Sequence, residues 1–482
     1  MNQYMVVGSF VFFLVAFTLV GILSARKKQA TSEDYLVASR NVNPWLTALS
    51  AVSTNNSGYM FIGLIGFAWR DGLEAIWITI GFVVGDFLTW LWVHRRVRAQ
   101  SEAVGASSVP SLLATDHLGR VSRPIAIATG ALTFFFLGGY AAAQLKAGSA
   151  TLTALFGWPL WAGSVIGVFV VVIYCFSGGI RASIWTDSVQ SVVMIVSMAL
   201  LLGYCFLEVG GIDALFTRLT EIDPKLVEWT PRGLKFGVLL YLIGFVFAGI
   251  GTVGQPHILI RFMAIDAVDS IKKARNIYFV WYTLFSIAAL AVGLYARVIL
   301  PNLTRGLEGA AAISASEGAL PTMAVALLPS ILVGVMLAGI FSATMSTADS
   351  QILSCSAAVT QDMFPRWQES YTASKVATLS VAGVALAIAL FATSGVFSLV
   401  LVAWSALAST LGPLLLIRLA KLPLPTPLGL AMIGVGLATV FLWGASDYAG
   451  DIFKAMPGML FPLALYWVVM AVVRPKTDKQ DS

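Results

Sequence analysis

The stretch Ala51-Val-Ser-Thr-Asn-Asn-Ser-Gly-Tyr-Met60 interrupts an apolar run that extends from Trp45 to Phe67. Its residues 53 to 57 are all polar. Ser and Asn side chains compete for the backbone hydrogen bonds of a helix, and Gly58 weakens the helix further. The stretch therefore predicts a local break in a helix that would otherwise be continuous.

The composition places this break inside a membrane. Of the 482 residues, 58% are hydrophobic and 11% are charged, whereas a soluble domain carries roughly 25% charged residues. We therefore expect an all-α integral membrane protein. Hydropathy predicts thirteen membrane-spanning helices, at about 4–23, 44–68, 73–94, 123–154, 158–177, 183–206, 234–256, 276–299, 320–360, 372–393, 396–419, 426–445 and 456–473.

Basic residues indicate how these helices are oriented. Lys and Arg cluster on alternate loops, for example at 26–28, 95–98 and 272–275. The positive-inside rule then predicts an outside N-terminus and a cytoplasmic C-terminus, in a multi-pass protein of the cell inner membrane. Asn55 falls about eleven residues, or roughly 16 Å, from the cytoplasmic start of its helix. Backbone that leaves a helix at that depth must line a cavity or be buried in protein.

A second break is predicted by Gly249, Gly251, Gly254 and Pro256. Interrupted first helices in two inverted halves are typical of secondary transporters and point to the substrate site. The predicted organisation is an extra N-terminal helix at 1–30, a first five-helix repeat at 44–206, an external loop at 207–233, a second inverted repeat at 234–420, two C-terminal helices at 426–473 and a cytoplasmic tail at 474–482.

A packed helix is the alternative to a binding site at the first break, because small polar residues also join neighbouring helices in membranes. Five polar residues in succession favour a binding site. Where the breaks interrupt the helices, backbone carbonyls become available to a cation and N–H groups to an anionic ligand group.

A second polar cluster lies in a later predicted span. Ser346, Asp349 and Ser350 share one helix face at i, i+3 and i+4. Hard oxygen ligands with one negative charge favour a monovalent cation. Asp187 falls about one turn into its own helix and is expected in the same half of the membrane. The alternative for Asp187 is an acid that the helix dipole favours at an N-terminus.

The remaining intramembrane charges, Asp86 and Lys146, have no companion motif. A structural ion pair, or snorkelling of the lysine, is the favoured interpretation. Nucleotide loops, metal-ligand spacing and a nucleophile beside a base are absent from the sequence, so we predict neither an enzyme nor an ATP-driven pump. The net charge of +6 lies mostly in short loops and indicates no nucleic-acid partner.

Five motifs, in order and in the expected helices, resemble the sodium/solute symporter family over nearly the whole chain, in particular its sodium/proline symporters. They are Glu33–Arg40, Asn55–Tyr59, Trp185–Gln190, Gly254–Ala264 and Met345–Gln351. The resemblance implies a thirteen-helix protein with an inverted five-plus-five, LeuT-like core.

The resemblance also implies roles for single residues. One sodium ion would be held by Ser53, Asn56, Ala343, Ser346 and Thr347, and a second, as in some members, by Asp187 with Ser346, Asp349 and Ser350. The solute would bind near Asn55, Ser57, Gly58, Phe134, Ala248, Thr252 and Gln255.

This chain departs from the proline symporters in the predicted solute site. They carry an acid where it has Asn55 and aromatic residues where it has Ala248 and Thr252, and Phe134 aligns with a tyrosine. We expect the loss of two rings to widen the pocket.

The sequence therefore predicts a sodium-coupled symporter that imports a small organic solute, an amino acid such as proline or a related carboxylate, by alternating access. The expected partners are this solute, Na+ and the lipid bilayer, without an obligatory protein partner. The alternatives are a nutrient sensor that reuses the transporter fold, a symporter for a sugar acid or a monocarboxylate, and proton coupling through Asp187 and Asp349. A sensor would need an output domain or a separate partner, and the expected tail is short.

Overall fold

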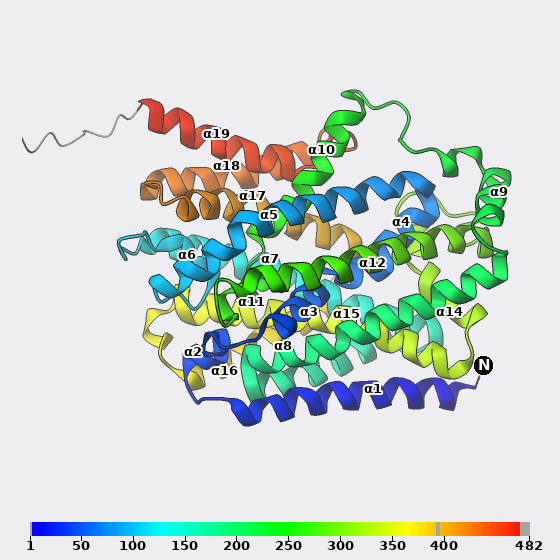
Figure 1. Ribbon diagram of the computed structural model, residues 1–482, viewed down its shortest axis with the longest axis horizontal. Helices are drawn as coiled ribbons and strands as arrows, with labels where there is room; N and C mark the ends of the chain where they lie inside the picture. The colour runs from blue at the N-terminus through cyan, green and yellow to red at the C-terminus, as the bar shows by residue number, and fades with distance from the viewer. Residues whose placement is uncertain (1, 392–395, 473–482) are drawn as a thin grey trace, which may run out of the picture.

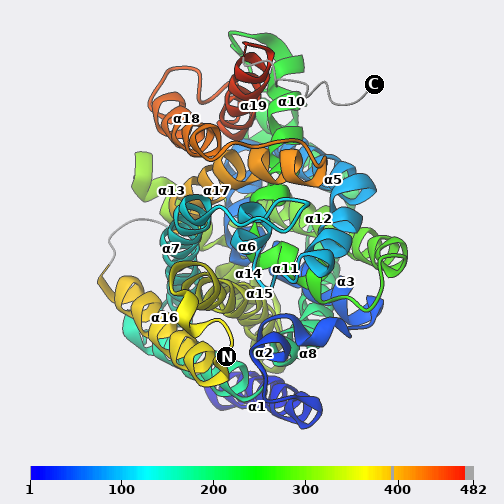
Figure 2. The same ribbon diagram turned by 90° about the vertical axis from the view of Figure 1, so that its left-hand side faces the viewer.

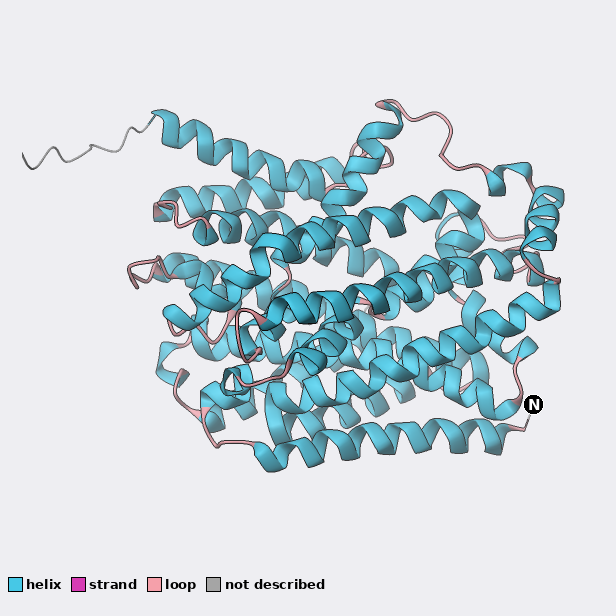
Figure 3. Ribbon diagram, viewed as in Figure 1, coloured by secondary structure: helices cyan, strands magenta, loops and turns pink. Residues whose placement is uncertain are grey.

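The computed structural model describes residues 2–391 and 396–472, and these residues form helices joined by loops (Figure 3). Long helices lie side by side in one bundle (Figures 1 and 2), with α1 at one edge and α18 and α19 at the opposite edge. The predicted tail at 474–482 lies outside the described residues. The all-α membrane architecture that composition predicts is therefore confirmed.

The described part of the first half contains nine α-helices. They are α1 (Gln3–Ser24), α2 (Ser32–Val37), α3 (Pro44–Asn55), α4 (Leu64–Asp71), α5 (Ile76–Ala103), α6 (Val109–Ala114), α7 (Arg123–Phe156), α8 (Leu160–Val209) and α9 (Ile212–Ile222). The predicted external loop at 207–233 thus contains the end of α8 and a short helix.

The described part of the second half adds ten more. They are α10 (Gly237–Ile250), α11 (Pro256–Ala264), α12 (Ser270–Ile299), α13 (Gly309–Glu317), α14 (Ala319–Leu327), α15 (Ser330–Ala357), α16 (Tyr371–Phe391), α17 (Val396–Leu419), α18 (Thr426–Gly444) and α19 (Ala455–Val472). Helix α15 lies at the centre, where it packs against α1, α3, α7, α8 and α16.

The number of membrane spans differs from the predicted thirteen. By length and composition the described residues contain eleven candidate spans, or twelve if α13 and α14, bent by 42°, form one. One difference is α8, whose 50 residues count as one candidate span although Gly179 (φ 56°, ψ −140°) leaves helical geometry in the predicted gap between 177 and 183. The other is the candidate span at 59–103, which joins parts of the predicted spans 44–68 and 73–94. The predicted span 320–360 corresponds to α14 and α15, which are separated at Pro329 because proline does not continue the helix that precedes it.

Both predicted breaks are present in the structure. Helix α3 ends at Asn55, Asn56 leaves helical geometry (φ −86°, ψ 48°), and the chain resumes as a π-helical turn at Tyr59–Gly63. Helix α10 ends at Ile250, a 3-10 turn covers Gly251–Gly254, and α11 begins at Pro256 after an extended Gln255.

The two ends of the bundle carry different loops and short helices. Figure 1 places the start of α1 and helix α9 at one end, and helices α2 and α6 at the other. Of the helices that flank the two breaks, α3 and α11 pack against the central helix α15.

Candidate functional site

Hydroxyl and carbonyl oxygens meet where α15 crosses the first break. The Ser346 hydroxyl donates to the Ser53 carbonyl at 3.2 Å, and the Thr347 hydroxyl donates to the Thr54 carbonyl at 2.9 Å. Both hydroxyls also reach the Ala343 carbonyl, at 3.3 and 3.0 Å respectively. All of these residues are buried. The crossing therefore concentrates neutral oxygen ligands from two helices in one place.

Asn56 stands at the break itself, beside this oxygen cluster. Its side-chain nitrogen turns back to donate to the Val52 carbonyl at 2.8 Å, and its buried amide oxygen has no hydrogen-bond partner among the described residues. Uncharged carbonyl and hydroxyl oxygens suit a hard monovalent cation such as sodium. The structure brings Ser53, Ala343, Ser346 and Thr347 into direct contact, so these residues fit a sodium ion chemically.

The residues predicted for a second sodium ion are also close together, but the guanidinium of Arg261 lies among them. Its Nη2 atom lies 3.1 Å from Asp187 Oδ2 and 3.9 Å from Asp349 Oδ1. The same nitrogen donates to the Ser350 hydroxyl and, at 2.9 Å, to the Ser183 hydroxyl. The two carboxylates are thus paired with a protein cation, whereas the prediction assigns their oxygens to a sodium ion alone.

Sequence analysis does not predict this position of Arg261, because hydropathy ends the span at residue 256. In the structure the buried chain continues through α11 to Ala264, and every residue of α11 is buried. A buried arginine is tolerated there because two carboxylates face it. The signal was in the sequence: Arg261 follows the second break by two turns within the motif Gly254–Ala264.

A small pocket lies beside the first break. Its lining consists mainly of aromatic and apolar side chains, from Asn55, Ser57, Tyr59, Met60, Phe82, Tyr140, Tyr282, Val400, Leu401 and Trp404. The cavity volume is about 20 Å³, and one water needs about 10–15 Å³. The pocket is therefore closed in this structure, and a solute requires its side chains to move apart.

Three of the predicted solute residues lie at this first break. Asn55 and Ser57 line the pocket, and the Ser57 hydroxyl lies 3.2 Å from the Tyr140 hydroxyl. The Gly58 backbone N–H donates to Gln144 on α7 at 2.9 Å, so this residue fixes the break against α7.

The three predicted residues of the second break lie behind the pocket rather than in its lining. Trp404 of α17 donates its indole N–H to the Ala248 carbonyl at 2.9 Å, so a ring of the pocket lining lies beside Ala248. Thr252 donates to Asp86 at 3.2 Å. Gln255 donates to the Trp404 carbonyl at 3.0 Å and links the break to α17.

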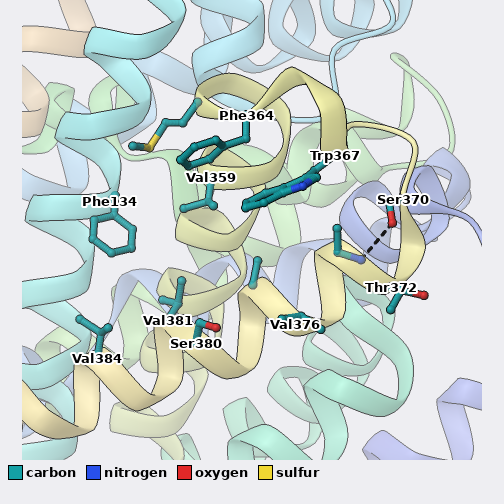
Figure 4. A pocket seen from close by; sticks show the side chains of 13 residues that line it. Phe134, Val359, Phe364, Trp367, Ser370, Thr372, Val376, Ser380, Val381 and Val384 are labelled. Atoms are coloured by element: carbon teal, nitrogen blue, oxygen red, sulfur yellow. Dashed lines mark hydrogen bonds between the residues drawn. The ribbon is translucent and has the colours of Figure 1, made fainter.

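Phe134 lies apart from both breaks. It lines a different cavity of about 640 Å³ between α7 and α16, where its ring lies on the same side as Val384 and across from Trp367 (Figure 4). Tyr140, six residues and roughly 9 Å further along α7, is the aromatic residue of this helix that faces the first break. The structure therefore corrects the prediction that Phe134 lies at the solute site. The sequence does not reveal which face of a buried helix meets a break.

Comparisons with known proteins agree with this arrangement. The model of the Sodium:solute symporter family matches residues 35–420. A sodium/proline symporter of Salmonella typhimurium is 31% identical, over 94% of this chain and 90% of its own length. The high-affinity proline transporter PutP of Bacillus subtilis is 29% identical, over 95% and 96% of the two chains.

A solved structure, of a Na+-coupled sialic acid symporter in a substrate-bound outward-open state, is similar over 98% of both chains, with a TM-score of 0.79 and 19% identity. This likeness confirms the LeuT-like fold. The family match covers most of the chain, and the relatives are transporters. The chain therefore belongs to the sodium:solute symporter family, with sodium as the coupling ion for transport of a small solute.

Proposed function

We propose that this symporter imports a small organic solute, an amino acid such as proline or a related carboxylate, across the inner membrane by alternating access. The observation that supports this most directly is the meeting of the first break with the hydroxyls of Ser346 and Thr347, next to a closed pocket. The names of the curated relatives favour an amino acid.

In this mechanism one sodium ion joins α3 to α15 through Ser53, Asn56, Ala343, Ser346 and Thr347. The pocket beside it opens to one side of the membrane at a time. Sodium and solute are coupled because both favour the same conformer, with a coupling free energy of about 1–3 kcal/mol. Sodium bound at the break would stabilise the outward-open state, and the solute would then bind before the pocket closes.

A second sodium ion near Asp187, Asp349 and Ser350 remains part of the proposal. When both acids are ionised, two carboxylates and the single guanidinium of Arg261 leave one negative charge without a counter-charge. One monovalent cation would balance this charge. Without it, an unpaired negative charge would remain in a desolvated site, which is costly.

The proposed topology is thirteen spans with an outside N-terminus and a cytoplasmic C-terminus. It counts α8 as two spans on either side of Gly179 and each interrupted helix as one span. The first and second five-helix repeats, 44–206 and 234–420, then enter the membrane from opposite sides, as two inverted halves do.

Uptake into proteoliposomes that contain the purified full-length chain tests this function. We expect radiolabelled amino acids to accumulate above equilibrium with an inward sodium gradient, and not with an equal potassium gradient at the same pH. Binding of a solute without any flux into the vesicles would contradict symport and favour a sensor. Accumulation with a proton gradient alone would contradict sodium coupling.

A further inference from the structure

A buried carboxylate lies between the two helix breaks. Asp86 of α5 is 1% exposed. It accepts a hydrogen bond from the hydroxyl of Tyr278 at 2.6 Å, and the hydroxyls of Thr252 and Thr89 lie 3.2 and 3.3 Å from it. The side-chain nitrogen of Asn55 lies 3.5 Å from it. Asn55 belongs to the first break and Thr252 to the second, so this one acid contacts both.

Glycines allow α5 to approach the second break this closely. A Cβ atom on Gly249 would lie 2.9 Å from both the Gly81 carbonyl oxygen and the Asp86 backbone nitrogen, closer than real Cβ atoms come. Gly81 and Gly85 have the four-residue spacing that brings membrane helices into backbone contact. The position of Asp86 beside the break is therefore fixed by the backbone crossing.

The hydroxyl of Tyr278 determines how the Asn55 amide is turned. Its single proton is donated to Asp86, so its oxygen accepts from Asn55 Nδ2 at 2.6 Å. The amide oxygen of Asn55 consequently points away from Tyr278 and Asp86. Since Asn55 lines the pocket and these two partners do not, the amide oxygen is the acceptor that Asn55 offers to a solute.

No protein cation balances the charge of Asp86 among the described residues, because every ion pair there involves a different acid. Its hydrogen-bond partners are all neutral donors. An ionised carboxylate with only neutral partners is costly at membrane depth. A cationic ligand group beside Asn55 would supply the missing positive charge.

The pocket lining also favours a cation over an anion. Lys and Arg are absent from its lining residues, so an anion without a cationic group finds no counter-charge there. Its walls include the rings of Tyr59, Phe82, Tyr140, Tyr282 and Trp404, and aromatic faces attract cations.

We propose that Asp86 supplies the negative charge of the solute pocket and thereby selects solutes that carry a protonated nitrogen. The nitrogen donates to the amide oxygen of Asn55, which Asp86 and Tyr278 hold in place. Asp86 acts through Asn55 and is a positioning residue. This inference rests on the proposed symport function and narrows its substrate class to amino acids and related amines, excluding sugar acids and monocarboxylates.

Sodium-driven uptake of solutes with and without a nitrogen tests the inference. Proteoliposomes with the full-length chain receive the twenty common amino acids together with lactate and cyclopentanecarboxylate, which replace the nitrogen of alanine and proline by oxygen and carbon. We expect sodium-driven accumulation of nitrogen-bearing solutes only. Asp86→Asn should weaken the apparent affinity for the best amino acid by about tenfold or more, the loss of a charge-assisted interaction. Stabilisation of the detergent-purified variant by sodium alone should persist.

Two further variants separate charge from folding. Asp362→Asn removes another buried acid, which Ser108 and Ser111 hold with hydroxyl donors at 2.7 and 2.6 Å, and it should leave solute selectivity unchanged. The double variant Asn55→Asp with Asp86→Asn transfers the carboxylate from residue 86 to residue 55. It should restore selectivity for nitrogen-bearing solutes.

Accumulation of lactate or cyclopentanecarboxylate by the unmodified protein, or an Asp86→Asn variant with unchanged amino-acid affinity, would overturn the inference while leaving symport intact. Absence of any sodium-driven uptake by the unmodified protein would instead contradict the proposed function itself.

Discussion

Single residues set the charge balance inside the bundle, where Arg261 lies between Asp187 and Asp349. The spacing of Ser346, Asp349 and Ser350 predicts a shared face, and the structure has the Ser350 hydroxyl 2.8 Å from the Asp349 carboxylate. Sequence analysis misses the pairing of Arg261, because hydropathy places this residue outside a span. The four-residue spacing of Gly81 and Gly85 indicates a close helix crossing beside Asp86, but the sequence analysis did not use it.

Removal of the Arg261 charge is expected to destabilise the protein. Arg261→Met leaves Asp187 and Asp349 buried without their cation, and breaking a buried pair costs about 3–5 kcal/mol. We predict a clear fall in the Tm of the detergent-purified variant, partly recovered by adding Asp187→Asn. Arg95→Gln, which removes a cation from an exposed pair with Asp269, is the control and should change Tm little. Unfolding of Arg261→Met at the unmodified Tm would contradict the paired arrangement.

Among helices, interruptions are predictable from residue type but the path of the chain is not. Serine, asparagine, glycine and proline mark both breaks, and the structure has both. Hydropathy separates α8 into two segments, and the structure has a non-helical Gly179 (φ 56°) between them, with residues 174 and 186 on either side both next to Gly21 of α1. A Cβ on Gly179 would clash with Tyr35 of α2, a contact between segments distant in sequence that no local pattern contains.

The crossing of α5 and α10 provides a test of close helix packing. Gly249→Ala places a methyl group against the backbone of α5, and overpacking of this kind costs about 1–3 kcal/mol. We expect a lower Tm and weaker solute uptake, because the backbone contact positions Asp86. Gly434→Ala in α18, where a Cβ meets nothing within 4 Å, is the matched control. Equal Tm values for the two variants would show that the crossing tolerates a methyl group.

For the whole molecule, composition and charge suffice to predict a multi-span membrane protein, and the motifs imply its family. The closed state of the pocket is beyond sequence analysis, because it depends on how side chains from α3, α5, α7, α12 and α17 meet. A cavity of about 20 Å³ does not hold an amino acid, so transport requires a second conformer in which these helices separate.

The central claim is that sodium binds where α15 crosses the first break and drives uptake from there. Its most direct test is the sodium dependence of solute uptake into proteoliposomes. The double variant Ser346→Ala with Thr347→Ala should lose sodium stimulation, because it removes both hydroxyl ligands. Ser354→Ala, which removes a buried α15 hydroxyl without a partner among the described residues, should keep the unmodified dependence. Unchanged sodium stimulation in the double variant would contradict the account.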